Sequence, residues 1–281
     1  MWPTLISIGP VAIHSFGVFV ALGVFFGGFV LWQKGREEGF EEEGLMDAWL
    51  VALLVALVVS RLVFVLLNWE TFSGSAYKMM FLTKFPGLSG SGAFLGGLLS
   101  LWITSIRKKW DSWSLLEISV FSFLMMGIFG WVGNFLAGST LGKTTNLFWG
   151  LSFPGVIGKR HPVQLLWILV LMGIYWLLKK WEKKYRSFSW YQQSKDEAKT
   201  GFLLASYLMI LGLAQLVLGL VTENSVWWFG AGLILIGSLI LVNRSGIKIE
   251  LVKSKNVQKE DDEVKLRKPK LKRKKKGFDF K

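Results

Sequence analysis

Several long stretches of this chain consist almost entirely of apolar residues, and the charged residues lie between them. A bilayer core about 30 Å thick requires roughly 20 apolar residues per helix, and several stretches reach that length. A backbone in lipid must satisfy its own hydrogen bonds, so only helices and closed barrels can cross it. The stretches are too continuous for the alternating pattern of barrel strands. The sequence therefore predicts an all-α polytopic membrane protein.

Seven apolar segments predict a bundle of about seven transmembrane helices. They span residues 11–33, 46–68, 91–106, 115–136, 164–181, 200–222 and 225–243. The third is short and rich in glycine, which lets helix backbones approach closely, so we expect it to pack inside the bundle. The first lacks a basic leader and a cleavage site, so we interpret it as a retained helix. The two longest outer loops, Trp69–Gly90 and Ala137–Val163, are expected to form short surface or re-entrant elements.

The distribution of Lys and Arg predicts the orientation of the bundle. Of the 33 Lys and Arg residues, 27 fall on the side that includes the C-terminal segment. The opposite side holds only Lys78, Lys84, Lys143, Lys159 and Arg160. Because positively charged loops remain in the cytoplasm, we expect the N-terminus outside and the C-terminus in the cytoplasm.

Much of the net charge of +14 comes from the end of the chain. We interpret residues 1–246 as the transmembrane domain and 247–281 as a basic, largely disordered cytoplasmic tail. Such a tail is expected to contact anionic lipid of the inner leaflet. A cytosolic protein is the alternative partner, and nucleic acid is not expected. The chain has no cysteine and only two histidines, His14 and His161, so neither a metal centre nor another cofactor is expected.

Arg61 lies within the second segment, between Ser60 and Leu62. A charged side chain at membrane depth costs at least ~2.5 kcal/mol on insertion scales, and such residues are usually functional. We therefore expect Arg61 to bind a phosphate or to pair with an internal group. Snorkelling is the alternative, since Arg61 lies one or two turns from the outer end of its segment.

Two further motifs offer groups that suit a lipid headgroup. Gly133, Asn134 and Gly138 close the fourth segment, where an amide and accessible backbone N–H groups can bind oxygens; a helix cap is the alternative. Arg160 and His161 precede the fifth segment, where Arg160 can bind a phosphate bidentately. His161 can act as a base or simply hydrogen-bond the backbone at the helix start.

The ordered set of motifs resembles the prolipoprotein diacylglyceryl transferase family over roughly residues 8–243. The residues that carry the resemblance are His14–Gly17, Ala21–Gly23, Ser60–Leu62, Asn68, Trp69, Gly133–Phe135, Gly138, Gly142, Lys143, Trp149, Arg160–Pro162, Gln164, Gly201–Leu203 and Gly212. The resemblance implies a transferase of the bacterial plasma membrane. Its substrates would be phosphatidylglycerol and the signal peptide of a prolipoprotein, whose lipobox cysteine thiol becomes a thioether as glycerol phosphate leaves.

The resemblance also implies roles for particular residues. Arg61 and Arg160 would contact the phosphate, since the reaction needs cations to stabilise the departing charge. Asn134 and the glycine backbone at Gly133, Gly138 and Gly142 would orient the headgroup. His161 would be the base that produces the thiolate, which is the nucleophilic form of cysteine.

Seven motif positions carry other residues than the family does. They are Phe16 and Leu211 in place of tyrosines, Ser91 in place of histidine, Trp131 and Gln215 in place of arginines, Ser139 in place of an acid and Ala137 in place of asparagine. These replacements motivate the alternative of a catalytically degenerate member that binds lipid or signal peptide without transfer. A channel or transporter is less favoured, because the chain shows no internal repeat.

Overall fold

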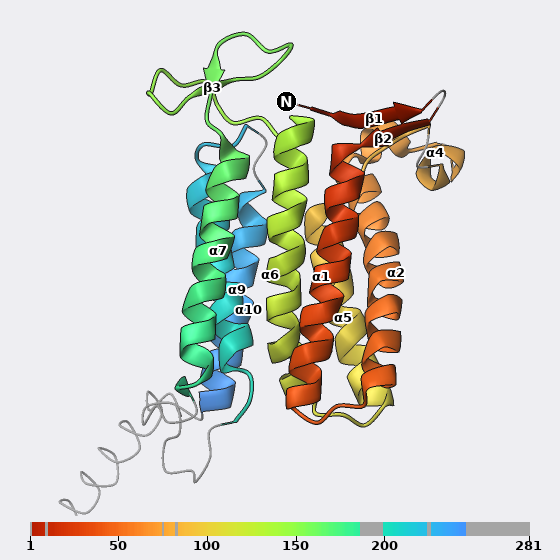
Figure 1. Ribbon diagram of the computed structural model, residues 1–281, viewed down its shortest axis with the longest axis vertical. Coiled ribbons are helices and arrows are strands. Elements are labelled where there is room, and N and C mark those ends of the chain that lie inside the picture. The colour runs from red at the N-terminus through yellow and green to blue at the C-terminus, as the bar shows by residue number, and fades with distance from the viewer. Residues whose placement is uncertain are drawn as a thin grey trace, which may run out of the picture. The chain divides into compact units, whose positions relative to one another are not determined.

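The structure is a computed structural model and describes residues 2–8, 11–74, 76–81, 84–185, 199–223 and 226–245. Over this part of the chain it is a bundle of long helices that run along a common axis (Figure 1). They are α1 (Ser15–Glu37), α2 (Glu42–Leu67), α5 (Gly90–Arg107), α6 (Ser112–Ala137), α7 (Val163–Glu182), α9 (Phe202–Gly219) and α10 (Trp227–Ser245). The prediction for the basic tail lies outside the described residues.

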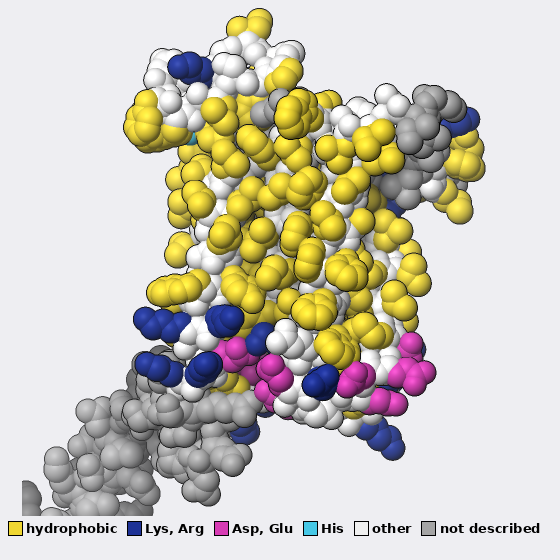
Figure 2. All heavy atoms as spheres, viewed as in Figure 1, with side chains coloured by type: hydrophobic (Ala, Val, Ile, Leu, Met, Phe, Trp, Pro, Cys, Tyr) yellow, Lys and Arg dark blue, Asp and Glu magenta, His cyan; other side chains and the backbone are white. Residues whose placement is uncertain are grey.

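Six of these helices are long and apolar enough to cross a membrane, and α5 is the exception. Apolar side chains cover the middle of the bundle, whereas Lys, Arg, Asp and Glu gather at one end (Figure 2). We call that end the charged face; it holds the turns at 38–41 and 108–111. The opposite end, the loop face, holds the N-terminal strands and the segments 68–74, 76–81, 84–89 and 138–162. This distribution confirms the predicted polytopic membrane fold.

Close helix pairs are built on small residues, as is common in membranes. The pair α2–α5 meets at Gly96, where an added Cβ would lie 2.7 Å from the Cβ of Val59. The pair α9–α10 meets at Gly212, where an added Cβ would lie 2.5 Å from the carbonyl oxygen of Gly230. A side chain at either position would force the two helices apart.

The helix α5 differs from the prediction that it packs inside the bundle. Its glycine face contacts α2, but Leu95, Leu99 and Ile103 are exposed on the other side. The glycines therefore mark a close contact on one face only. An exposed stripe of Leu and Ile at the periphery of a membrane bundle suits contact with lipid.

The start of the chain also differs from the prediction of a helix from residue 11. Strands β1 (Thr4–Ile8) and β2 (Val11–His14) pair antiparallel, and α1 begins only at Ser15. Short runs rich in Ile and Val on either side of a Gly-Pro pair are typical of a hairpin. The other short elements of the described ranges lie on the loop face: α3 (Trp69–Phe72), α4 (Ala76–Met80), β3 (Leu151–Ser152) and β4 (Lys159–Arg160).

Near the charged face, a buried carboxylate joins α6 to α9. Glu117 is 4% exposed; it accepts hydrogen bonds from the backbone N–H of Leu203, at 2.8 Å, and from the hydroxyl of Tyr185, at 3.0 Å. The cap residue of α9 is Gly201, which has no side chain to offer. Glu117 thus satisfies a free N–H of the first turn of α9 from a neighbouring helix.

Candidate functional site

Arg61 fastens a segment of the loop face to α2. Its guanidinium donates three hydrogen bonds of 2.9 Å, to the carbonyl oxygens of Lys78, Met79 and Gly87. The residue is 7% exposed, and its guanidinium carbon lies 5.1 Å from the ring centre of Phe72. Three of its five N–H donors therefore bind the chain itself.

The start of α5 lies against the same part of α2. The Ser89 hydroxyl accepts from the Gly92 N–H and shares a 2.8 Å hydrogen bond with the Ser91 hydroxyl. The Ser60 hydroxyl, next to Arg61, donates to the Ser89 carbonyl at 2.8 Å. Ser91, where the resemblance places a histidine, thus belongs to a hydroxyl cluster at the start of α5.

Asn134 and Gly138 end α6. Gly138 adopts the left-handed conformation, with φ 67°, and its N–H donates to the Asn134 carbonyl. The Asn134 side-chain oxygen accepts from the N–H of Thr140 at 3.2 Å, and the exposed Ser139 lies within this turn. Gly133 packs against α1, where an added Cβ would lie 3.2 Å from the Cα of Phe16.

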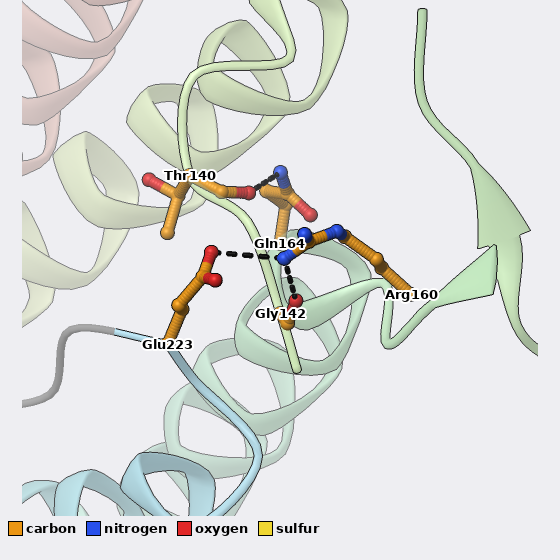
Figure 3. Close-up of polar contacts among 5 residues, drawn as sticks. All are labelled: Thr140, Gly142, Arg160, Gln164 and Glu223. Atoms are coloured by element: carbon orange, nitrogen blue, oxygen red, sulfur yellow. Dashed lines mark hydrogen bonds and ion pairs between the residues drawn. The ribbon is translucent and has the colours of Figure 1, made fainter. Parts of the chain in front are cut away.

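Arg160 lies at the centre of a polar cluster formed by three segments of the loop face (Figure 3). Its Nη1 donates to the Gly142 carbonyl at 3.1 Å and to the Glu223 carboxylate at 2.9 Å. The Glu223 segment is held in place by backbone hydrogen bonds to Leu141 and from Lys143. At Gly142 an added Cβ would lie 2.3 Å from the His161 carbonyl oxygen, so only glycine fits.

Gln164, in the first turn of α7, completes this cluster. Its side chain is 0% exposed, and its Nε2 donates to the Thr140 carbonyl. Its Oε1 has no hydrogen-bond partner among the described residues, and neither does the buried Nε of Arg160. Neither Gln164 nor Glu223 was predicted to take part in the site. A prediction of which residues are buried in the first turn of α7 could have identified Gln164, but no feature of the neighbouring sequence indicates that Glu223 pairs with Arg160.

His161 is half-buried beside the cluster and contacts an indole. The Nε1–H of Trp149 points at His161 Nδ1, at 3.4 Å. In this arrangement Nδ1 holds the lone pair and Nε2 carries the hydrogen. The imidazole therefore offers a donor at Nε2 and can take up a proton only at Nδ1.

An aromatic pair lies one turn below Asn134 and Gln164. Trp131 on α6 stacks on Trp167 of α7, with ring centres 5.5 Å apart and planes at 5°. The position at which the resemblance places an arginine is thus filled by a ring of a stacked pair. Gln215 on α9 packs its aliphatic carbons close to Gly230 of α10, and Leu211 is half-buried in the core.

The predicted site residues fall into two groups on the loop face. Arg61 and Ser91 lie with α2, α4 and α5, whereas Asn134, Arg160 and His161 lie where α6 ends and α7 begins. Figure 1 places α4 and β3 on opposite sides, with α1 and α6 between them. Within the described ranges, no three His, Asp or Glu side chains are placed to hold a metal ion.

The second group has the features of an anion site. Arg160 brings a fixed positive charge to the start of α7, where the helix dipole also favours negative charge. The exposed side chains of Lys143 and Lys159 lie in the adjoining strand and loop. A phosphate that binds Arg160 would compete with the carboxylate of Glu223, which is 49% exposed.

The chain is similar in sequence to proteins of several bacteria. A phosphatidylglycerol–prolipoprotein diacylglyceryl transferase of Clostridium tetani is 26% identical over 201 residues, which cover 68% of this chain and 80% of that protein. The protein of the same name from Thermoanaerobacter sp. is 27% identical over 229 residues, covering 79% and 77%. Phosphatidylglycerol–prolipoprotein diacylglyceryl transferase 2 of Clostridium perfringens is 23% identical over 254 residues, covering 84% and 92%.

A family model extends the similarity beyond single relatives. The model described as prolipoprotein diacylglyceryl transferase matches residues 3–244, which include every helix of the described bundle and both groups of site residues. The chain therefore belongs to the prolipoprotein diacylglyceryl transferase family.

Proposed function

We propose that this protein transfers the diacylglyceryl group of phosphatidylglycerol to the lipobox cysteine of a prolipoprotein. The observation that carries the proposal is the family match over residues 3–244, supported by relatives that bear the name of this activity. The chain is a multi-pass protein of the bacterial plasma membrane. Its lipid substrate can therefore reach the bundle from the surrounding bilayer.

The reaction forms a carbon–sulfur bond and breaks a carbon–oxygen bond. The cysteine thiolate attacks the glycerol carbon that bears the phosphate, and the bonding electron pair leaves with the phosphate oxygen of glycerol phosphate. The thiol proton passes to a base. Negative charge grows on the leaving phosphate, so a cation placed there lowers the barrier. Arg160 and the N-terminus of α7 supply positive charge at one place, which favours them as the phosphate-binding element.

His161 is the proposed base. Its available lone pair is at Nδ1, which accepts from Trp149, so proton uptake requires the indole to release this nitrogen. Asn134 is proposed to orient the headgroup through its amide nitrogen, since its oxygen already caps the turn after α6. Gly133, Gly138 and Gly142 shape the backbone around it.

Arg61 lies in the other group of site residues, so it is proposed to contact the phosphate of a lipid on its own side of the loop face, through the two N–H donors that its three carbonyl partners leave over. The loop face is proposed to be extracytoplasmic, which follows from the Lys and Arg distribution. Residues 247–281 are proposed as a separate cytoplasmic tail that contacts anionic lipid of the inner leaflet. Nucleic acid is not proposed as a partner.

The test uses the full-length protein in liposomes that contain phosphatidylglycerol with labelled acyl chains. A peptide with a lipobox cysteine is the acceptor, and a peptide with serine in its place is the control. We expect a labelled thioether on the cysteine peptide only, and release of glycerol phosphate in equal amount. Absence of product, under conditions in which another family member is active, would refute transfer and leave the lipid-binding alternative.

A further inference from the structure

Two buried polar atoms in the Arg160 cluster lack hydrogen-bond partners within the described residues. They are the Nε of Arg160, a donor, and the Oε1 of Gln164, an acceptor. Nearly all buried polar atoms in proteins are paired, so each exception requires an explanation. The two atoms belong to neighbouring side chains at the start of α7 (Figure 3), which makes a shared ligand the simplest one.

The orientation of the Gln164 amide follows from its other contact. The Thr140 carbonyl can only accept a hydrogen bond, so it selects the Nε2 end of the amide. The remaining atom, Oε1, is therefore an acceptor and not a donor. Because Gln164 is 0% exposed, bulk water does not satisfy this acceptor.

The two atoms together indicate which chemical groups the ligand carries. A cationic guanidinium N–H calls for an anionic oxygen, and an amide oxygen calls for a hydroxyl or N–H hydrogen. A phosphate esterified to a polyol carries both groups within one headgroup. An amine headgroup would supply a donor too, but it would bring a positive charge beside Arg160 and close to Lys143 and Lys159.

We propose that Gln164 accepts a hydrogen bond from a hydroxyl of the phosphatidylglycerol headgroup while Arg160 Nε binds its phosphate. Gln164 is then a specificity-determining residue of the lipid site. This inference rests on the proposed function. Entry requires the half-exposed carboxylate of Glu223 to leave Arg160, which frees the guanidinium to turn toward the phosphate.

The test compares lipids that differ only in the headgroup hydroxyls. Phosphatidylpropanol has the charge and length of phosphatidylglycerol but lacks both hydroxyls. We expect the wild-type protein to bind phosphatidylglycerol roughly tenfold more tightly, because the analogue leaves the buried Oε1 unpaired. Binding is measured by native mass spectrometry of the full-length protein. Equal affinity for the two lipids in the wild type would overturn the proposal without any variant.

The variant Gln164→Met keeps the side-chain length and removes the acceptor. We expect it to bind the two lipids equally, while the control Gln33→Met, at an exposed position on α1, keeps the roughly tenfold preference. If Gln164→Met folds and still prefers phosphatidylglycerol, the two unpaired atoms bind a buried water in the wild type instead, and the proposal is wrong.

Two further readouts separate the possible sources of failure. Lipid binding is measured without acceptor peptide, so loss of transfer with intact discrimination would refute the proposed function and not this inference. Glycerol 1-phosphate carries the same two hydroxyls and a phosphate, here a monoester, without acyl chains. We expect it to displace the lipid only in large excess; displacement at equal concentration would assign the site to the free product instead.

Discussion

Replacing Arg61 with methionine separates a structural role for this residue from a role in phosphate binding. The guanidinium donates three hydrogen bonds of 2.9 Å to loop carbonyls. Hydrogen bonds to charged groups are worth about 1.5–3 kcal/mol each. Because the loop carbonyls regain some water when the partner is lost, we expect Arg61→Met to cost about 4 kcal/mol in total, near the value for breaking a buried charged network.

That loss should lower the apparent melting temperature in detergent by roughly 10 °C, at about 2–4 °C per kcal/mol for a chain of this size. It should also release the loop that Arg61 holds. Trypsin cleavage after Lys78 and Lys84 reports this release directly. Arg61→Lys retains the charge but not the three-way geometry, so we expect an intermediate effect.

The matched control is Arg107→Met, which removes an arginine at the exposed end of α5. It should change the melting temperature by less than about 2 °C. A structural role for Arg61 is refuted if Arg61→Met melts at the same temperature as the wild type and is cleaved by trypsin at the same rate, but transfers no lipid. Arg61 would then act on the substrate, and its loop contacts would contribute little.

The remaining predictions concern packing and charge. Glu117→Leu removes the carboxylate that accepts from a buried backbone N–H and a tyrosine hydroxyl, so it should destabilise the protein by about 2–5 kcal/mol. Glu117→Gln retains one acceptor oxygen and should cost clearly less. Thermal unfolding distinguishes the two variants. Gly96→Leu should separate α2 from α5 and cost at least about 2 kcal/mol in the same assay. Glu223→Ala removes the carboxylate that competes with phosphate for Arg160, so the KM for phosphatidylglycerol should fall about threefold to fivefold; a higher KM would show that Glu223 positions the arginine. Trp131→Arg introduces the cation that the family resemblance places at this position and should raise kcat at least tenfold; an unchanged kcat would mean that this position does not face the phosphate.

The sequence predicted the helices well because hydrocarbon imposes one strict requirement on every spanning segment. Long apolar runs located all seven helices to within a few residues. The hairpin at residues 4–14 was missed because its apolar residues run directly into the first helix, so hydropathy alone shows no boundary. The exposed side of α5 was missed because glycine indicates a close contact but not how many faces of the helix are covered.

The site was predictable as a set of residues but not as an arrangement. Arg61 and Arg160 are both cations near the same membrane surface, and nothing local reveals that they belong to groups on opposite sides of α6. The partners of Arg160 come from a distant loop, and Glu223 lies 63 positions further along the chain. Such pairs depend on how helix ends meet, which motif spacing does not record.

The ends of α6 and α7 stay together around the Arg160 cluster although Trp131 stands where the family resemblance places an arginine. Gly138 turns the chain back after α6, so the start of α7 lies beside the end of α6 and Asn134 and Gln164 belong to one layer. One turn below, Trp131 and Trp167 stack and hold the two helices together. An arginine at this position could also stack on an indole, so the ring pair replaces its packing but not its charge. Under the proposed function, the substitution lowers the number of cations available to the leaving phosphate, while the hydrogen bond of Gln164 to the Thr140 carbonyl is present.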